Sequence, residues 1–200
     1  MKGAKGKVGV ILLVALMMGG VARAGKLPPA PKVDLPFFVY SDRGAAEAGY
    51  DFAPSGWMGN TDAIEYNDCA DDPYFGDCCI EVIFDDRTGW GGIVWQNPAA
   101  NWGDEEGGLD LTGATRLTFW ARGKEGGERV EFSMGIIKKN KTFYDTTSVK
   151  LGKVKLDDTW KKYEIDLRGR DLSRIVTGFC FSVKGKKDPV TFYIDEIVYE

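Results

Sequence analysis

The chain has 200 residues, with 26 Lys and Arg, 30 Asp and Glu and no His, which gives a formal net charge of −4 at pH 7. Because it contains no histidine, it cannot form a Ser-His-Asp triad, a Cys-His pair or the common histidine-based zinc and general-base sites. The acidic balance, with scattered lysines, argues against nucleic acid or an anionic membrane surface as a partner. It is compatible with neutral ligands or with cations.

Residues 1–24 have the pattern of a secretory signal peptide. Three lysines precede an apolar run over residues 8–21, which is followed by the A-x-A cleavage pattern Ala22-Arg23-Ala24. The run is shorter than the roughly 20 residues that a membrane-spanning helix needs. We therefore expect cleavage after Ala24, a secreted or periplasmic location, no membrane span after cleavage and a monomer.

The remaining chain divides into a short linker and one domain. Residues 25–36 contain four prolines and are expected to be an extended linker. Residues 37–200 are long enough to bury a sizeable core as one domain.

Short segments with alternating apolar and polar residues follow one another along this domain, separated by turn residues. About ten such strands predict an all-β fold, an antiparallel β-sandwich of jelly-roll type with the first strand near the last. The expected strands are Phe37–Tyr40, Ala63–Tyr66, Cys78–Phe84, Gly92–Gln96, Arg116–Arg122, Arg129–Gly135, Thr146–Val149, Lys161–Leu167, Val176–Val183 and Val190–Tyr199.

Four cysteines would be in a disulfide-permissive compartment if the chain is exported. Of the three possible pairings, the one that joins the adjacent Cys78 and Cys79 is sterically poor. We predict that Cys69 pairs with Cys78, which would staple a short loop, and that Cys79 pairs with Cys180, which would tie two strands. The alternative is that Cys79 and Cys180 are buried free thiols. No C-x-x-C spacing is present, which argues against a zinc or thioredoxin-like site.

Tryptophans are concentrated in the stretch Trp90–Arg122, next to Asn, Gln and Gly. Trp90 and Trp95 are five positions apart, so on one strand they face opposite sides, one toward the core and one toward a ligand. An exposed indole can stack on a sugar ring while amides bond its hydroxyls. We expect Trp120 and Trp160 to pack. The candidate ligand-binding residues are Trp57, Trp90, Trp95, Gln96, Asn97, Asn101 and Trp102.

Several segments resemble the galactose-binding-domain-like jelly rolls, a fold shared by many non-catalytic carbohydrate-binding modules. They are GWGGIVWQNPAANWG, GLDLTGATRLTFWARGKEGGERVEFSMG, DDTWKKYEIDL, GFCFSV and the ending FYIDEIVYE. The resemblance implies a structural calcium ion held by the Asp of the last strand, here Asp195. Its partners would come from the first strands, for which Asp42 and Glu65 are the candidates.

The sequence therefore predicts an exported domain that binds a polysaccharide or another glycan without acting as an enzyme. One alternative is a structural or adhesive cell-envelope domain that binds a protein through a large, flat apolar patch. The other is a small glycoside hydrolase, which requires two carboxylates within about 10 Å in a cleft.

Overall fold

The computed structural model describes residues 27–42 and 51–200, so the signal peptide that we predict lies outside the described residues. These residues form strands and a single 3-10 turn, η1 (Thr61–Ala63). The strands are β1 (Phe37–Tyr40), β2 (Ala53–Gly59), β3 (Ile64–Cys69), β4 (Cys79–Phe84), β5 (Trp90–Gln96), β6 (Arg116–Gly123), β7 (Arg129–Met134), β8 (Val149–Lys155), β9 (Lys161–Asp166), β10 (Thr177–Lys184) and β11 (Val190–Tyr199). In this part of the chain, no helix is long and apolar enough to span a membrane.

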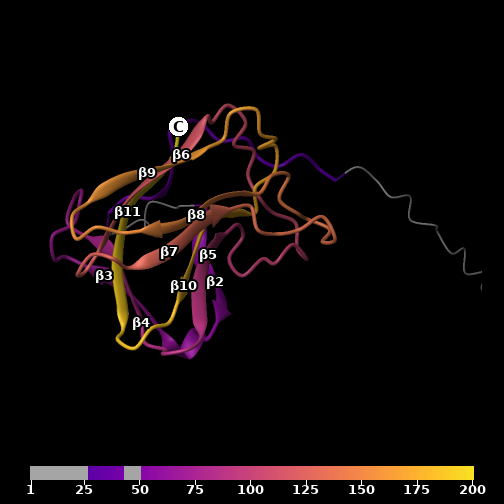
Figure 1. Ribbon diagram of the computed structural model, residues 1–200. Helices are drawn as coiled ribbons and strands as arrows, with labels where there is room; N and C mark the ends of the chain where they lie inside the picture. Colours follow the sequence, from indigo (N-terminus) through magenta and orange to yellow (C-terminus); the bar gives the residue numbers. More distant parts are fainter. Residues whose placement is uncertain (1–26, 43–50) are drawn as a thin grey trace, which may run out of the picture.

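The strands form two antiparallel sheets, which confirms the predicted β-sandwich (Figure 1). The five-stranded sheet has the order β2-β5-β10-β7-β8. The six-stranded sheet has the order β3-β4-β11-β6-β9, and β1 pairs with β11 as well. Phe37 lies opposite Tyr199, so the first strand is beside the last, as we expected.

The core lies between the sheets and is built from the apolar positions of the alternating strands. Phe119 of β6 packs against Phe132 of β7, with ring centroids 4.5 Å apart, and against Phe179 of β10 at 5.1 Å. Trp95 of β5 packs edge-on against Phe179 at 5.3 Å. Such aromatic pairs each add about 0.5–1.5 kcal/mol to the stabilisation that comes from burying their area.

Two strands differ from the prediction. The segment Ala53–Gly59 forms β2, which was not among the expected strands because Pro54 and its glycines have low strand propensity. It is tolerated because β2 is an edge strand with an irregularity between Pro54 and Gly56. The strand expected at Thr146–Val149 lies further along the chain, as β8.

The disulfide prediction is wrong, because no disulfide joins any of the four cysteines. Cys79 is at an outward-facing position of β4, and Cys180 is at an outward-facing position of β10 in the other sheet. The whole core separates them, since packed sheets lie about 10 Å apart and a disulfide requires Cα atoms within about 7 Å. Cys69 lies directly opposite Cys79 on the neighbouring strand, rather than beside Cys78.

Part of the predicted linker pairs with the domain. The backbone N–H of Val33 donates to the carbonyl of Asp110 at 3.2 Å, and Asp110 donates to Pro31 at 2.7 Å. Lys32 and Asp110 form an isolated parallel bridge. This segment is therefore held against the sandwich.

Candidate binding surface

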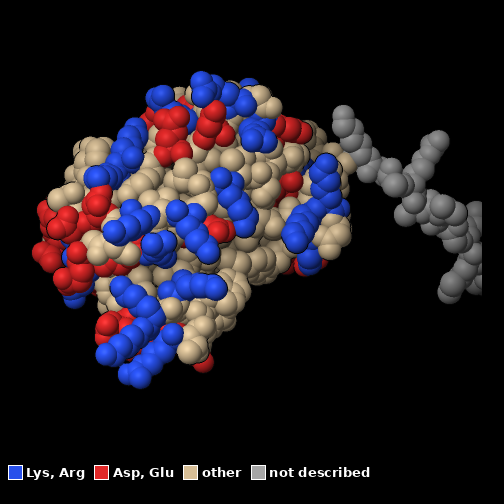
Figure 2. Space-filling view, in the orientation of Figure 1, with Lys and Arg blue, Asp and Glu red and all other residues tan. Residues whose placement is uncertain are grey.

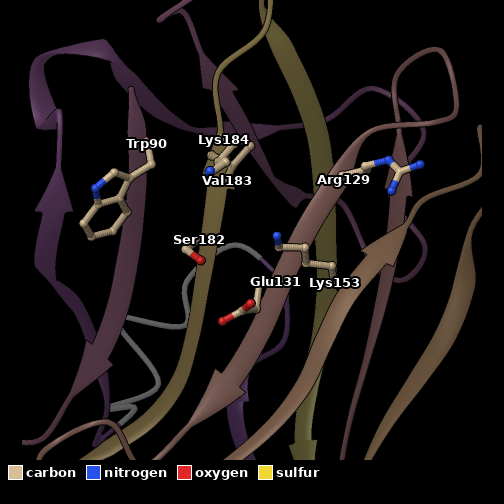
Figure 3. Close-up of a pocket in the computed structure, with 7 residues that line it drawn as sticks. All are labelled: Trp90, Arg129, Glu131, Lys153, Ser182, Val183 and Lys184. Carbon is tan, nitrogen blue, oxygen red and sulfur yellow. The ribbon is translucent and has the colours of Figure 1, made fainter. Parts of the chain in front are cut away.

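The outer face of the five-stranded sheet, which we call the open face, carries a hollow of about 240 Å³ (Figure 3). Side chains alternate along β5, so that Ile93 and Trp95 point into the core and Trp90 points outward. The hollow is lined by Trp90, Arg129, Glu131, Lys153, Ser182, Val183 and Lys184.

The hollow lies where the outward residues one row along the sheet from Trp90 are small, namely Gly92 of β5 and Ser182 of β10. Gly92 lies opposite Ser182 of β10, one row along the sheet from Trp90. A Cβ atom at Gly92 would lie only 2.4 Å from the carbonyl oxygen of Phe181, so this position accepts only glycine without movement of the backbone. Because these side chains in the middle of the sheet are small, one side of the Trp90 indole stays exposed to solvent.

The exposure of the two tryptophans on β5 confirms that they face opposite sides. Trp90 is 46% exposed, whereas Trp95 is 1% exposed and packs against Phe179 and Phe181. The open face therefore offers one aromatic platform from β5.

Polar and mostly basic side chains occupy the other side of the hollow. The Nζ of Lys150 lies 2.9 Å from Oε1 of Glu131. Lys153 lies opposite Glu131, which in turn lies opposite Ser182. Figure 2 shows Lys and Arg side chains spread over the part of the surface where Figure 1 has β7, β8 and β10.

Three of the residues predicted to bind a ligand lie below the surface: Trp95, Gln96 and Asn101. The amide of Gln96 donates to the carbonyl of Asn101 at 2.8 Å, and Oδ1 of Asn101 accepts the N–H of Gly103 at 2.8 Å. These amides satisfy the backbone of the loop that follows β5. A surface ligand cannot reach them without displacing the residues that cover them.

The other predicted residues are more accessible but are not gathered around the hollow. Trp57, 40% exposed, lies opposite Ile93 on the edge strand and so does not share the outward side of Trp90. Asn97 donates to the carbonyl of Asp51 at 2.6 Å and accepts the N–H of Gly108. Trp102 lies beyond the other end of β5 and borders a second hollow, lined by Ile136, Ile137, Lys138, Asn140 and Lys141.

The outer face of the six-stranded sheet, which we call the covered face, also contains aromatic residues, but they contact one another. Trp120 stacks on Tyr74 with ring centroids 3.7 Å apart. Trp160 donates its indole N–H to the carbonyl of Asp72 at 2.9 Å, and the Arg122 guanidinium lies 3.9 Å from the centre of the Tyr193 ring. The segment between β3 and β4 thus covers these side chains, and Trp120 and Trp160 pack as expected.

Asp195, the residue that the resemblance assigned to calcium, holds this covering segment. Its Oδ2 accepts the backbone N–H groups of Tyr74 and Phe75, each at 3.0 Å, and its Oδ1 accepts that of Glu196 at 2.8 Å. Burial raises the pKa of the Asp195 carboxyl to about 6. Both carboxylate oxygens are therefore already used by the backbone.

The other two predicted calcium ligands do not complete a site with Asp195. Asp42 also binds this segment, by accepting the N–H of Asp77 at 2.9 Å. Glu65 is exposed and lies opposite Ile83, more than about 10 Å along β4 from the level of Asp195. Among residues 27–42 and 51–200, no three His, Cys, Asp or Glu side chains are grouped to hold a metal. The described arrangement does not fit the ion, and calcium binding stays a prediction.

The residues that the sequence analysis missed are Ser182, Glu131, Lys153 and their basic neighbours. Ser182 and Glu131 lie in strands that the sequence predicted, whereas Lys153 lies beyond the strand expected at Thr146–Val149. The outward positions of separate strands come together only through the sheet register. Their alternation with buried residues was the available signal, and it predicted the outward side without saying which strands are neighbours.

Known proteins resemble this chain in structure. No protein-family model matches the sequence, and no curated protein matches it. A family 30 carbohydrate-binding module of the cellulosomal cellulase Cel9D-Cel44B of Clostridium thermocellum is 17% identical, with a TM-score of 0.58 over 84% of this chain and 98% of that one. Another family 30 module structure has 18% identity and a TM-score of 0.59 over 84% and 99%.

A third similar structure is the glycoside hydrolase domain of Endo-D from Streptococcus pneumoniae R6, at 15% identity and a TM-score of 0.50. The match covers 71% of this chain and 21% of the Endo-D chain. These likenesses show the fold, which is the β-sandwich of carbohydrate-binding modules and is consistent with the galactose-binding-like type that we expected.

Proposed function

We propose that the protein binds a polysaccharide on the open face, with Trp90 as the platform on which a sugar ring stacks. The observation that carries this proposal is the exposed Trp90 indole beside a hollow, on the fold of carbohydrate-binding modules. An indole placed at the edge of a shallow, polar hollow suits a sugar ring, which has an apolar C–H face and a rim of hydroxyls.

The hollow supports binding without catalysis. Of the seven residues that line it, Glu131 is the one carboxylate, and it is paired with Lys150. Hydrolysis of a glycosidic bond generally requires two carboxyl groups on either side of that bond. We therefore propose that the bound glycan leaves unchanged.

The same proposal includes export and a monomeric state, which follow from the sequence pattern of residues 1–24 and from the single domain. N-terminal sequencing of the protein recovered from the medium or periplasm should start at Gly25. Retention of residues 1–24 in the cell pellet would contradict export.

Retention on a panel of soluble and insoluble glycans tests the proposal. The wild-type domain should be retained by at least one polysaccharide class, and Trp90→Ala should lose that retention by about tenfold or more, since each factor of ten corresponds to about 1.4 kcal/mol. Trp57→Ala is the matched control, because Trp57 is similarly exposed on the same sheet but does not line the hollow. Equal loss in both variants would contradict the assignment of the open face.

A further inference from the structure

We propose that the polysaccharide bound on the open face is acidic, with carboxylate groups that pair with a row of cations beside Trp90. This inference rests on the proposed function and adds the chemical class of the ligand. An acidic ligand would not be expected from the net charge of the chain, which is negative.

The register of the sheet places three cations in one row. Trp90 lies opposite Lys184. Val183 lies opposite Val130, so the next outward pair on these strands is Lys184 and Arg129. Arg129 in turn lies opposite Lys155 of β8. Because neighbouring strands are about 4.8 Å apart, the three positions fall within about 10 Å. We call Lys184, Arg129 and Lys155 the cation row.

Figure 3 shows two members of the row, Lys184 and Arg129, at the same end of the hollow as Trp90, with Lys153 and Glu131 further along the strands. Lys153 adds a fourth positive charge, opposite Glu131. The carboxylate of Glu131 lies beside the ammonium group of Lys150, 2.9 Å away. Basic groups thus border the hollow on the side away from the Trp90 indole.

The cation row has no counter-charge in the described part of the chain. The ion pairs found there include Lys150 with Glu131, and none of them involves Lys184, Arg129, Lys153 or Lys155. Like charges directly opposite each other on neighbouring strands destabilise a sheet. Arg129 and Lys155 are such a pair. A bound anion would relieve this repulsion, so the row favours an acidic ligand over a neutral one.

The available hydrogen-bond donors also favour an acidic ligand. Neutral sugars are commonly held by amide side chains, but Gln96 and Asn101 are buried and bonded to the backbone. Apart from the hydroxyl of Ser182 and the indole N–H of Trp90, the side-chain donors around the hollow are ammonium and guanidinium groups. These groups form strong, charge-assisted bonds with carboxylates, and a guanidinium can bind one with two parallel bonds.

The test compares acidic polysaccharides with neutral polymers made from them. Polygalacturonate, polymannuronate and a glucuronate-bearing xylan are each immobilised beside the product of reducing their carboxyl groups. The wild-type domain should be retained by at least one acidic polymer and about tenfold more weakly by its reduced form, and raising NaCl from about 50 mM to about 500 mM should weaken retention.

Variants that each remove one positive charge test whether the cation row is responsible for retention on the acidic polymer. Arg129→Gln and Lys155→Gln should each weaken retention on the acidic polymer by about threefold to tenfold. Lys162→Gln removes the same charge from an exposed residue of β9 in the other sheet and should leave retention unchanged. An equal loss in Lys162→Gln would overturn the role of the cation row, because it would mean that total charge alone decides binding.

Each remaining outcome separates the two proposals. Retention by the neutral polymers alone, unaffected by salt, would overturn the acidic class and leave polysaccharide binding in place. Failure of every glycan to retain the domain would overturn the proposed function itself. Equal retention on single-stranded DNA, unaffected by Trp90→Ala, would overturn the acidic-glycan proposal in favour of unspecific binding of polyanions.

Discussion

The two outer faces of the sandwich use aromatic and charged residues in opposite ways. On the covered face, Trp120 stacks on Tyr74 and both oxygens of Asp195 accept backbone N–H groups. On the open face, Trp90 is exposed and Lys184, Arg129 and Lys155 lie in a row without counter-charges among the described residues. The presence of tryptophan and charge therefore does not indicate a binding site. The open face differs because its exposed indole and its cation row have no stacking or ion-pair partner among the described residues.

The largest expected effect comes from removing the hydrogen bonds that hold the covering segment. Asp195→Ala leaves the N–H groups of Tyr74, Phe75 and Glu196 without their acceptor. These hydrogen bonds are partly buried, and a hydrogen bond to a charged group contributes about 1.5–3 kcal/mol, so we expect the free energy of unfolding to fall by about 2–4 kcal/mol. Urea denaturation measures this change. An unchanged midpoint would mean that the covering segment contributes nothing to stability.

Two tryptophan-to-alanine variants, one on each face, should affect different properties of the protein. Trp120→Ala should lower the free energy of unfolding by about 1–3 kcal/mol, because its ring stacks on Tyr74, and should keep glycan retention in the fraction that stays folded. Trp90→Ala should leave stability within about 0.5 kcal/mol and reduce retention. The reverse pattern, with Trp90→Ala lowering stability and Trp120→Ala lowering retention, would show that the two faces do not differ in this way.

Stability should also depend on pH through Asp195. Its pKa is raised from 3.8 to about 6 in the folded protein, mainly by burial. The folded state therefore holds the proton more tightly than the unfolded chain, so this contribution to stability is present in full below pH 3.8 and is lost as the pH rises through about 6. Asp195→Asn should remove it, which the difference between the two pH profiles of unfolding measures. A difference of the opposite slope would show that the pKa is lowered.

The smallest expected effect is that of removing calcium. Because the oxygens of Asp195 accept backbone hydrogen bonds and Glu65 lies elsewhere on the sheet, we expect EDTA to change the melting temperature by less than about 2 °C. A clear drop that added calcium reverses would support the calcium ion expected from the resemblance. It would then require the covering segment to rearrange around Asp195.

The sequence was sufficient to predict the sandwich, because strands such as β6 and β11 alternate clearly between apolar and polar residues. It was insufficient for β2, whose Pro54 and glycines are tolerated only because the strand is at an edge. It also predicted that Trp90 and Trp95 face opposite sides. The cation row could not be predicted, since Arg129, Lys155 and Lys184 are distant in sequence and meet only through the register.

The most direct test of the central claim is a two-dimensional NMR titration of the 15N-labelled domain with a glycan that it retains. The chain has six tryptophans, and each indole N–H gives its own signal. Trp90 reports on the open face, and Trp120 and Trp160 report on the covered face. We predict that the Trp90 indole and the amides of Glu131 and Ser182 shift with ligand concentration, while the Trp120 and Trp160 indoles do not. Shifts centred on Trp120 and Trp160, with Trp90 unchanged, would contradict this prediction.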